Sequence, residues 1–175
     1  PTVDSFNFTR FLATGGTLRN RSLAVSADGS RLAFVAGGEV NGVDTGHYNA
    51  YLYEAEADEL VCMSCPDGEP KADPEDPALL CGGVNHSGGS PYASDLHEPY
   101  VISANGSRVF FHTAESLVPR DTNGKYDVYV WQDGEPHLIS SGKGRYDARF
   151  VDADPSGDNV FFATRNQLVA SDDDE

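Results

Sequence analysis

The chain has 175 residues, of which 39% are hydrophobic, and its 28 acidic against 12 basic residues give a formal net charge of −16. A charge of this sign disfavours nucleic acid and anionic membranes as partners, because phosphate binding needs a basic surface. No stretch approaches the ~20 apolar residues of a membrane span, so no membrane insertion is expected. Eighteen glycines and ten prolines favour many short elements over long helices.

The first elements in chain order form a unit of four short strands. Residues 1–21 are predicted to be an N-terminal strand or linker, without the basic start and apolar stretch of a signal peptide. Residues 22–65 contain short runs rich in aromatic and β-branched residues, which turn residues separate. This pattern predicts strands at 22–25, 31–35, 50–54 and 59–62.

The same unit recurs further along the chain. Three stretches share a short strand, a glycine turn and a second strand: SADGSRLAFVA (26–36), SANGSRVFFHT (103–113) and DPSGDNVFFAT (154–164). Asp-Gly and Asn-Gly favour a hairpin turn because both residues tolerate positive φ. The match predicts a second unit over 98–141 and a truncated third unit over 146–175. Their strands are expected at 99–102, 108–113, 127–131 and 136–140, and then at 148–153 and 159–164.

Four strands in a repeat of this length are typical of a propeller blade, a small antiparallel sheet that stacks on its neighbours. The predicted fold is therefore all-β: a partial β-propeller of about two and a half four-stranded antiparallel blades. The only helical candidate is a short turn near Ala114–Leu117. Because known propellers have roughly four to eight blades, we expect a fragment of a longer propeller, with self-association through open blade edges. The acidic end, in which Asp172 aligns with Asp121, is expected to be a loop cut within a blade.

The residues that carry the repeat resemble a known family. SADGSRLAFVA with NAYLYEAEADELV, and SANGSRVFFHT with DVYVWQDGEPHLIS, are similar to the WD40-like, TolB-type (PD40) propeller repeats of bacterial secreted and envelope proteins. The resemblance covers about residues 20–65 and 98–175. It implies a non-enzymatic binding or scaffold module, extracellular or in the cell envelope, that recognises protein or carbohydrate. The alternatives are an accessory propeller domain of a hydrolase or peptidase, and a calcium-stabilised structural repeat.

The segment 66–97 falls outside the repeat, and its Pro, Gly, Asp and Ser content predicts an inserted loop. Cys62, Cys65 and Cys81 lie in it or beside it. A disulfide of Cys81 with Cys62 or Cys65 would close a loop of about twenty residues and leave one thiol free. Buried free thiols, or a zinc site with His86 as the fourth ligand, are the other interpretations.

Asp121, Asn123 and Asp127 form the pattern D-x-N-x-x-x-D before the third strand of the second unit. Hard cations prefer clustered oxygen ligands, so the pattern suggests calcium as a cofactor. It departs from an EF-hand, since Gly124 stands at position 4 and Lys125 takes a ligand position. The other interpretation, which we prefer, is a turn: Asp121 caps it, Asn123-Gly124 supplies positive φ and Asp127 bonds loop amides.

Sequence motifs of catalysis are lacking. The chain has no G-x-S-x-G, no P-loop and no dinucleotide fingerprint. HSGGS (86–90) places His and Ser side by side with nothing to orient them, and HEPYV (97–101) lacks the second His of a zinc peptidase. We therefore predict no enzyme activity. The histidines are scattered and expected at surface or strand positions: His47, His86, His97, His112 and His137.

Overall fold

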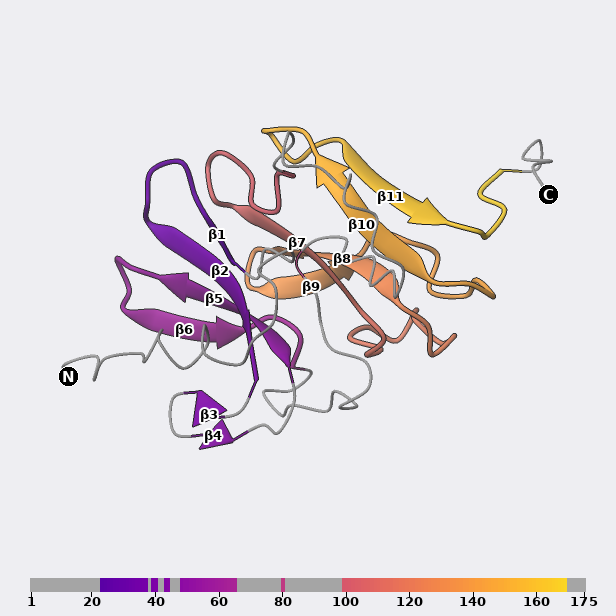
Figure 1. Ribbon diagram of the computed structural model, residues 1–175, viewed down its shortest axis with the longest axis horizontal. Coiled ribbons are helices and arrows are strands. Elements are labelled where there is room, and N and C mark those ends of the chain that lie inside the picture. Colours follow the sequence, from indigo (N-terminus) through magenta and orange to yellow (C-terminus); the bar gives the residue numbers. More distant parts are fainter. Residues whose placement is uncertain are drawn as a thin grey trace, which may run out of the picture.

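The computed structural model describes residues 23–37, 39–40, 43–44, 48–65, 80 and 99–169. Within these ranges the chain is all-β, as predicted, and every strand pair is antiparallel (Figure 1). In the same residues no helix is long and apolar enough to cross a membrane. Predictions for 1–21, for nearly all of the insert 66–97 and for 170–175 lie outside the described residues.

The first unit is a four-stranded sheet in the order β1-β2-β5-β6. All four predicted strands are confirmed to within one residue at each end, because turn residues separate runs that pair in a continuous register. A small two-stranded ladder in the connection from β2 to β5 was not predicted. The strands are β1 (Leu23–Val25), β2 (Arg31–Ala36), β3 (Glu39–Val40), β4 (Val43–Asp44), β5 (Asn49–Glu54) and β6 (Glu59–Cys62).

The second unit forms a three-stranded sheet, and the third unit a two-stranded one. The predicted strand at 99–102 is wrong: only an isolated bridge joins Ile102 to Val109. The Val101 carbonyl and the Ser103 amide still bond β7, at 2.8 and 2.9 Å. The ladder does not extend to Tyr100, because its amide donates to the Asp152 side chain at 2.9 Å. The strands are β7 (Arg108–Thr113), β8 (Asp127–Gln132), β9 (Glu135–Leu138), β10 (Ala148–Ala153) and β11 (Val160–Thr164).

The three sheets lie side by side in chain order, with the second between the other two (Figure 1). Its strand β7 is buried on both faces from Val109 to Thr113, and β10 packs against β7 and β8. The rings of Phe110 and Phe150 stack between the second and third sheets, with centroids 5.5 Å apart. One hydrophobic cluster runs through all three sheets, so the apolar faces of successive units bury one another.

Candidate functional site

The three predicted glycine turns fold alike. In each, the glycine amide donates to the carbonyl three residues earlier at 2.8–2.9 Å, and the glycine φ lies between +71° and +77°, a region that L-residues rarely adopt. Side chains reinforce the first turn, where Asp28 accepts from the Ser26 hydroxyl and the Ser30 amide. The hydrogen bond from Ser26, followed by those from Ser30, lowers the pKa of Asp28 to about 2. The glycines are Gly29, Gly106 and Gly157.

An arginine at the start of the second strand links each of the first two units to the next unit. The Arg31 guanidinium donates to the Gly106 carbonyl at 2.6 Å and pairs with Glu54 of its own sheet at 3.0 Å. We call this arrangement the arginine latch, because one side chain joins its own sheet to the glycine turn that follows in the chain.

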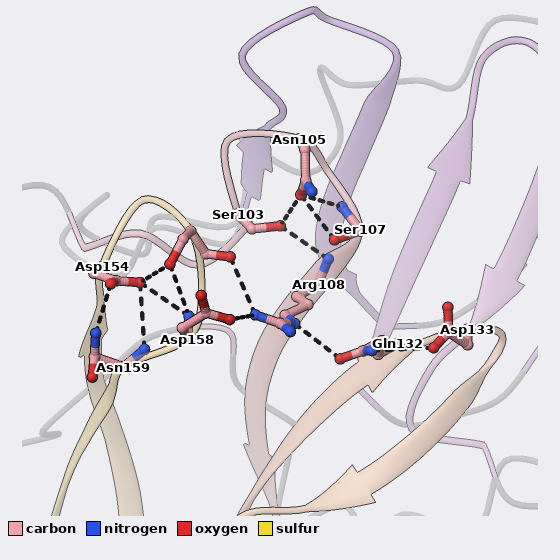
Figure 2. Close-up of polar contacts among 10 residues, drawn as sticks. Ser103, Asn105, Ser107, Arg108, Gln132, Asp133, Asp154, Asp158 and Asn159 are labelled. Atoms are coloured by element: carbon pink, nitrogen blue, oxygen red, sulfur yellow. Dashed lines mark hydrogen bonds and ion pairs between the residues drawn. The ribbon is translucent and has the colours of Figure 1, made fainter.

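The second arginine latch resembles the first, but its carbonyl acceptor lies one residue earlier in the glycine turn (Figure 2). Arg108 donates to the Ser156 carbonyl at 3.3 Å and contacts the Asp158 carboxylate at 2.5 Å. In its own sheet it donates to Gln132 at 2.9 Å, the residue that aligns with Glu54. The equivalent residue of the third unit is Asn159, which donates instead to Asp154 of its own turn.

A second recurring feature is a buried polar pair where the third strand begins. The Ser64 hydroxyl donates to the side-chain Oδ1 of Asn49 and accepts from the Ala50 amide. In the second unit the Ser140 hydroxyl donates to Asp127 and accepts from the next amide, that of Val128. An uncharged Asn and an acidic Asp therefore perform the same structural role.

The predicted calcium residues form a turn held by internal hydrogen bonds. Asn123 donates to the Asp127 carboxylate at 2.8 Å and accepts from the Lys125 amide at 2.8 Å. Gly124 has a φ of +61°, and Asp127 accepts from the Gly142 amide at 3.2 Å. These are contacts that the turn interpretation expects of Asn123, Gly124 and Asp127.

Asp121, the first residue of the D-x-N-x-x-x-D pattern, is buried. The Tyr129 hydroxyl donates to its Oδ2, whereas its Oδ1 has no hydrogen-bond partner in the structure. Burial raises the pKa of Asp121, and the hydrogen bond from Tyr129 opposes that shift. Burial, followed by the bond to Asp121, raises the pKa of Tyr129 well above its usual value. No group of three or more His, Cys, Asp or Glu among the described residues could hold a metal ion, and calcium stays a prediction.

Cys62 and Cys65 form a disulfide, with Cα atoms 5.4 Å apart. The predicted pairing of Cys81 with one of these two is therefore wrong. The reason is local: the Met63 amide bonds the Ala50 carbonyl at 2.8 Å, and the chain turns so that the two Cα atoms fall within disulfide range. The zinc hypothesis needs both sulfurs as thiolates, and here they are bonded to each other. Cys81 and His86 lie outside the described residues.

His112 is a buried residue whose environment the sequence did not reveal. It lies on β7, fully buried, and neither ring nitrogen has a hydrogen-bond partner in the structure. Its ring packs edge to face with the Tyr126 ring, and the two ring centroids are 5.7 Å apart. Burial, followed by the charge of Arg149, lowers the pKa of His112 to about 3, against the opposing effect of Asp147. A neutral imidazole without solvent access suits packing, because proton transfer needs a partner within reach.

Comparisons with protein-family models, with curated proteins and with solved structures found no match for this chain.

Proposed function

We propose that the chain is a non-enzymatic, propeller-type binding or scaffold module of a secreted or cell-envelope protein. The observation that carries this proposal is the arginine latch, in which arginines at equivalent positions join the first unit to the second and the second to the third. A contact that repeats from unit to unit favours stacking of blades in a fixed direction, as in a propeller.

The buried polar groups support a structural role for the repeat. Asn49 and Asp127 fill one position, and each bonds a buried serine. A group that acted as an acid or base would need a carboxylate in that position, whereas a hydrogen-bond acceptor can be an amide or a carboxylate. Because the position is filled by a neutral residue in one unit and by an acidic residue in the other, a structural role is favoured over a catalytic one.

The binding surface that we propose is the end of the sheets opposite the glycine turns. Tyr48 directly precedes β5 and Tyr146 lies two residues before β10, and both strands begin at this end. Their side chains are 52% and 43% exposed, and the Arg145 guanidinium lies 5.7 Å from the Tyr146 ring centroid. Exposed tyrosines combine a flat apolar face with a polar tip, which suits a protein or carbohydrate ligand.

The test is binding without turnover. The intact chain is screened on a carbohydrate array, and each ligand found is measured by calorimetry against the parent and Tyr146→Ala. Tyr100→Ala is the matched control, since Tyr100 is also 43% exposed and precedes a glycine turn. We expect Tyr146→Ala to weaken binding at least tenfold, or about 1.4 kcal/mol, with Tyr100→Ala unchanged and the ligand recovered intact. Release of cleaved products, or equal binding by all three proteins, would contradict the proposal.

A further inference from the structure

The first unit carries the acceptor half of an arginine latch, and no arginine of the described residues fills it. At Gly106 and Gly157, an added Cβ would lie 3.1 Å from the Cδ atoms of Arg31 and Arg108, respectively. At Gly29, whose φ and turn hydrogen bond are equivalent, an added Cβ would meet nothing within 4 Å. The surface on which an arginine stem lies in the other two turns is therefore open in the first.

An apolar side chain of the adjoining strand β1 is also exposed. Val25 in β1 aligns with Ile102 of the second unit and Ala153 of the third. Val25 is 54% exposed, whereas Ile102 is 6% and Ala153 is 3% exposed. Burial of an apolar side chain stabilises a fold, and Val25 lacks this contribution at the position where the other two units have it.

The charge of the open turn suits a guanidinium. Asp28 stands where the second turn has Asn105, and it is exposed. In the third turn a carboxylate, that of Asp158, contacts the incoming Arg108 at 2.5 Å. An acidic glycine turn thus already receives an arginine elsewhere in this molecule, and charge-assisted hydrogen bonds of this kind are stronger than neutral ones.

We propose that β1 and the Gly29 turn form a docking surface for one further β-unit of the same kind, with an arginine at the start of its second strand. This inference rests on the proposed function, because it extends the same stacking by one unit. A second copy of this chain does not fit the requirement. Its Arg31 and Arg108 are engaged within the copy, and its third unit has Asn159 at the equivalent position.

The experiment supplies such a unit to the full chain. Residues 99–143, which carry Arg108, are duplicated and joined ahead of residue 1, and amide hydrogen exchange is followed over residues 23–31. We expect exchange there to slow at least tenfold relative to the parent, and the Val25 methyl resonances to shift. Replacing only the added arginine by alanine should return both signals to the parent values.

Several outcomes would overturn the inference. Unchanged exchange over 23–31 would overturn the inference even if the added unit were itself unprotected. The added unit is expected to fold only when it docks, so an unfolded added unit also means that docking has failed. Slower exchange that persists after the added arginine is replaced would also overturn the inference. So would a parent chain that dimerises in sedimentation and is protected over 23–31 in the dimer. Arg108→Ala in the parent separates the two proposals. If Arg108→Ala leaves amide exchange in the third unit unchanged, the arginine latch does not hold the units together and the proposed function is contradicted. If exchange in the third unit becomes faster, the proposed stacking stands and only the docking surface at Gly29 is contradicted.

Discussion

The first and second units follow the same backbone plan with different side chains. Both begin the second strand with arginine and both place a glycine with positive φ before it. Between these fixed points, the partner of the arginine changes from Glu54 to Gln132, and the partner of the buried serine changes from Asn49 to Asp127. The comparison indicates that the turn glycine and the arginine are fixed by backbone conformation and by the contact between units. The hydrogen-bonding partners need only the right acceptor atom, so their charge can vary.

The two units differ most in one buried residue of the second strand and in the residues at the end of the last strand. His112 of the second unit occupies the position of Val35 in the first. The first unit ends in the Cys62–Cys65 disulfide, whereas the second has Leu138 in the place of Cys62. If the units are equivalent in architecture, substitutions that make one resemble the other should be tolerated or stabilising. Substitutions at the shared positions should be costly.

The largest effect is expected from His112→Val in acid. A buried base with a pKa lowered to about 3 contributes stability that is present above its unfolded pKa near 6.5 and is lost as pH falls toward 3. At pH 4 the loss is on the order of 3 kcal/mol, and His112→Val should remove it. Denaturant unfolding at pH 7 and pH 4 measures the difference. His137→Gln, at an exposed position, should keep the parent's pH dependence, and an identical dependence in His112→Val would refute the assignment.

The disulfide should contribute less. Cys62→Ser with Cys65→Ser opens a closed loop of four residues, which in the chain-entropy estimate lowers the free energy of unfolding by roughly 2 kcal/mol. Thiol titration of the denatured, unreduced parent should find one free thiol, since two of the three cysteines are paired. Cys81→Ser is the control and should leave no free thiol and an unchanged unfolding midpoint. Three free thiols in the parent would contradict the pairing.

Arg108→Ala is expected to lower the free energy of unfolding by about 1–2 kcal/mol, the range of one or two lost hydrogen bonds. Asp158 is 68% exposed in its side chain, so its ion pair contributes little of this. Most of the loss comes from the bonds to Gln132 and the Ser156 carbonyl. Asn159→Ala, at the equivalent position without a latch, should cost less. Urea unfolding of both variants tests the order, and a larger loss for Asn159→Ala would reverse it.

Gly106→Ala and Gly29→Ala isolate the difference between a filled and an open turn. Both glycines have φ above +70°, so both variants carry a similar backbone strain of about 1 kcal/mol. Only at Gly106 must an arginine stem also move, because the new Cβ would lie 3.1 Å from the Arg31 Cδ. Thermal unfolding should therefore place Gly106→Ala below Gly29→Ala by about 0.5–1 kcal/mol. Equal losses would show that the latch packs too loosely to matter.

The sequence predicted the strands well and the contacts between units poorly. Strand positions follow from local patterns of turns and apolar residues, and so does the recurrence of Gly29 and Gly106. The arginine latch depends on which unit lies beside which, and a repeated Arg in one sequence does not show its partner. The disulfide was missed because spacing alone does not fix Cα distances, and His112 because a lone histidine on a strand carries no sign of its burial. That the units are blades of a partial propeller stays a prediction, made from the recurring four-strand unit and from the resemblance.

The smallest effect is expected from Asp127→Asn, and it bears on the calcium hypothesis. Asparagine already fills this position in the first unit, and its carbonyl oxygen can accept the bonds from Ser140 and Gly142. The substitution forfeits the bond from Asn123 but removes a charge that raises the pKa of buried Asp121. These changes oppose each other, so stability should stay within about 0.5 kcal/mol of the parent. Millimolar calcium should leave both melting temperatures unchanged. A rise in the parent that Asp127→Asn abolishes would instead show that the free Oδ1 of Asp121 and the Asp127 carboxylate hold a cation that the first unit, with Asn49, does not need.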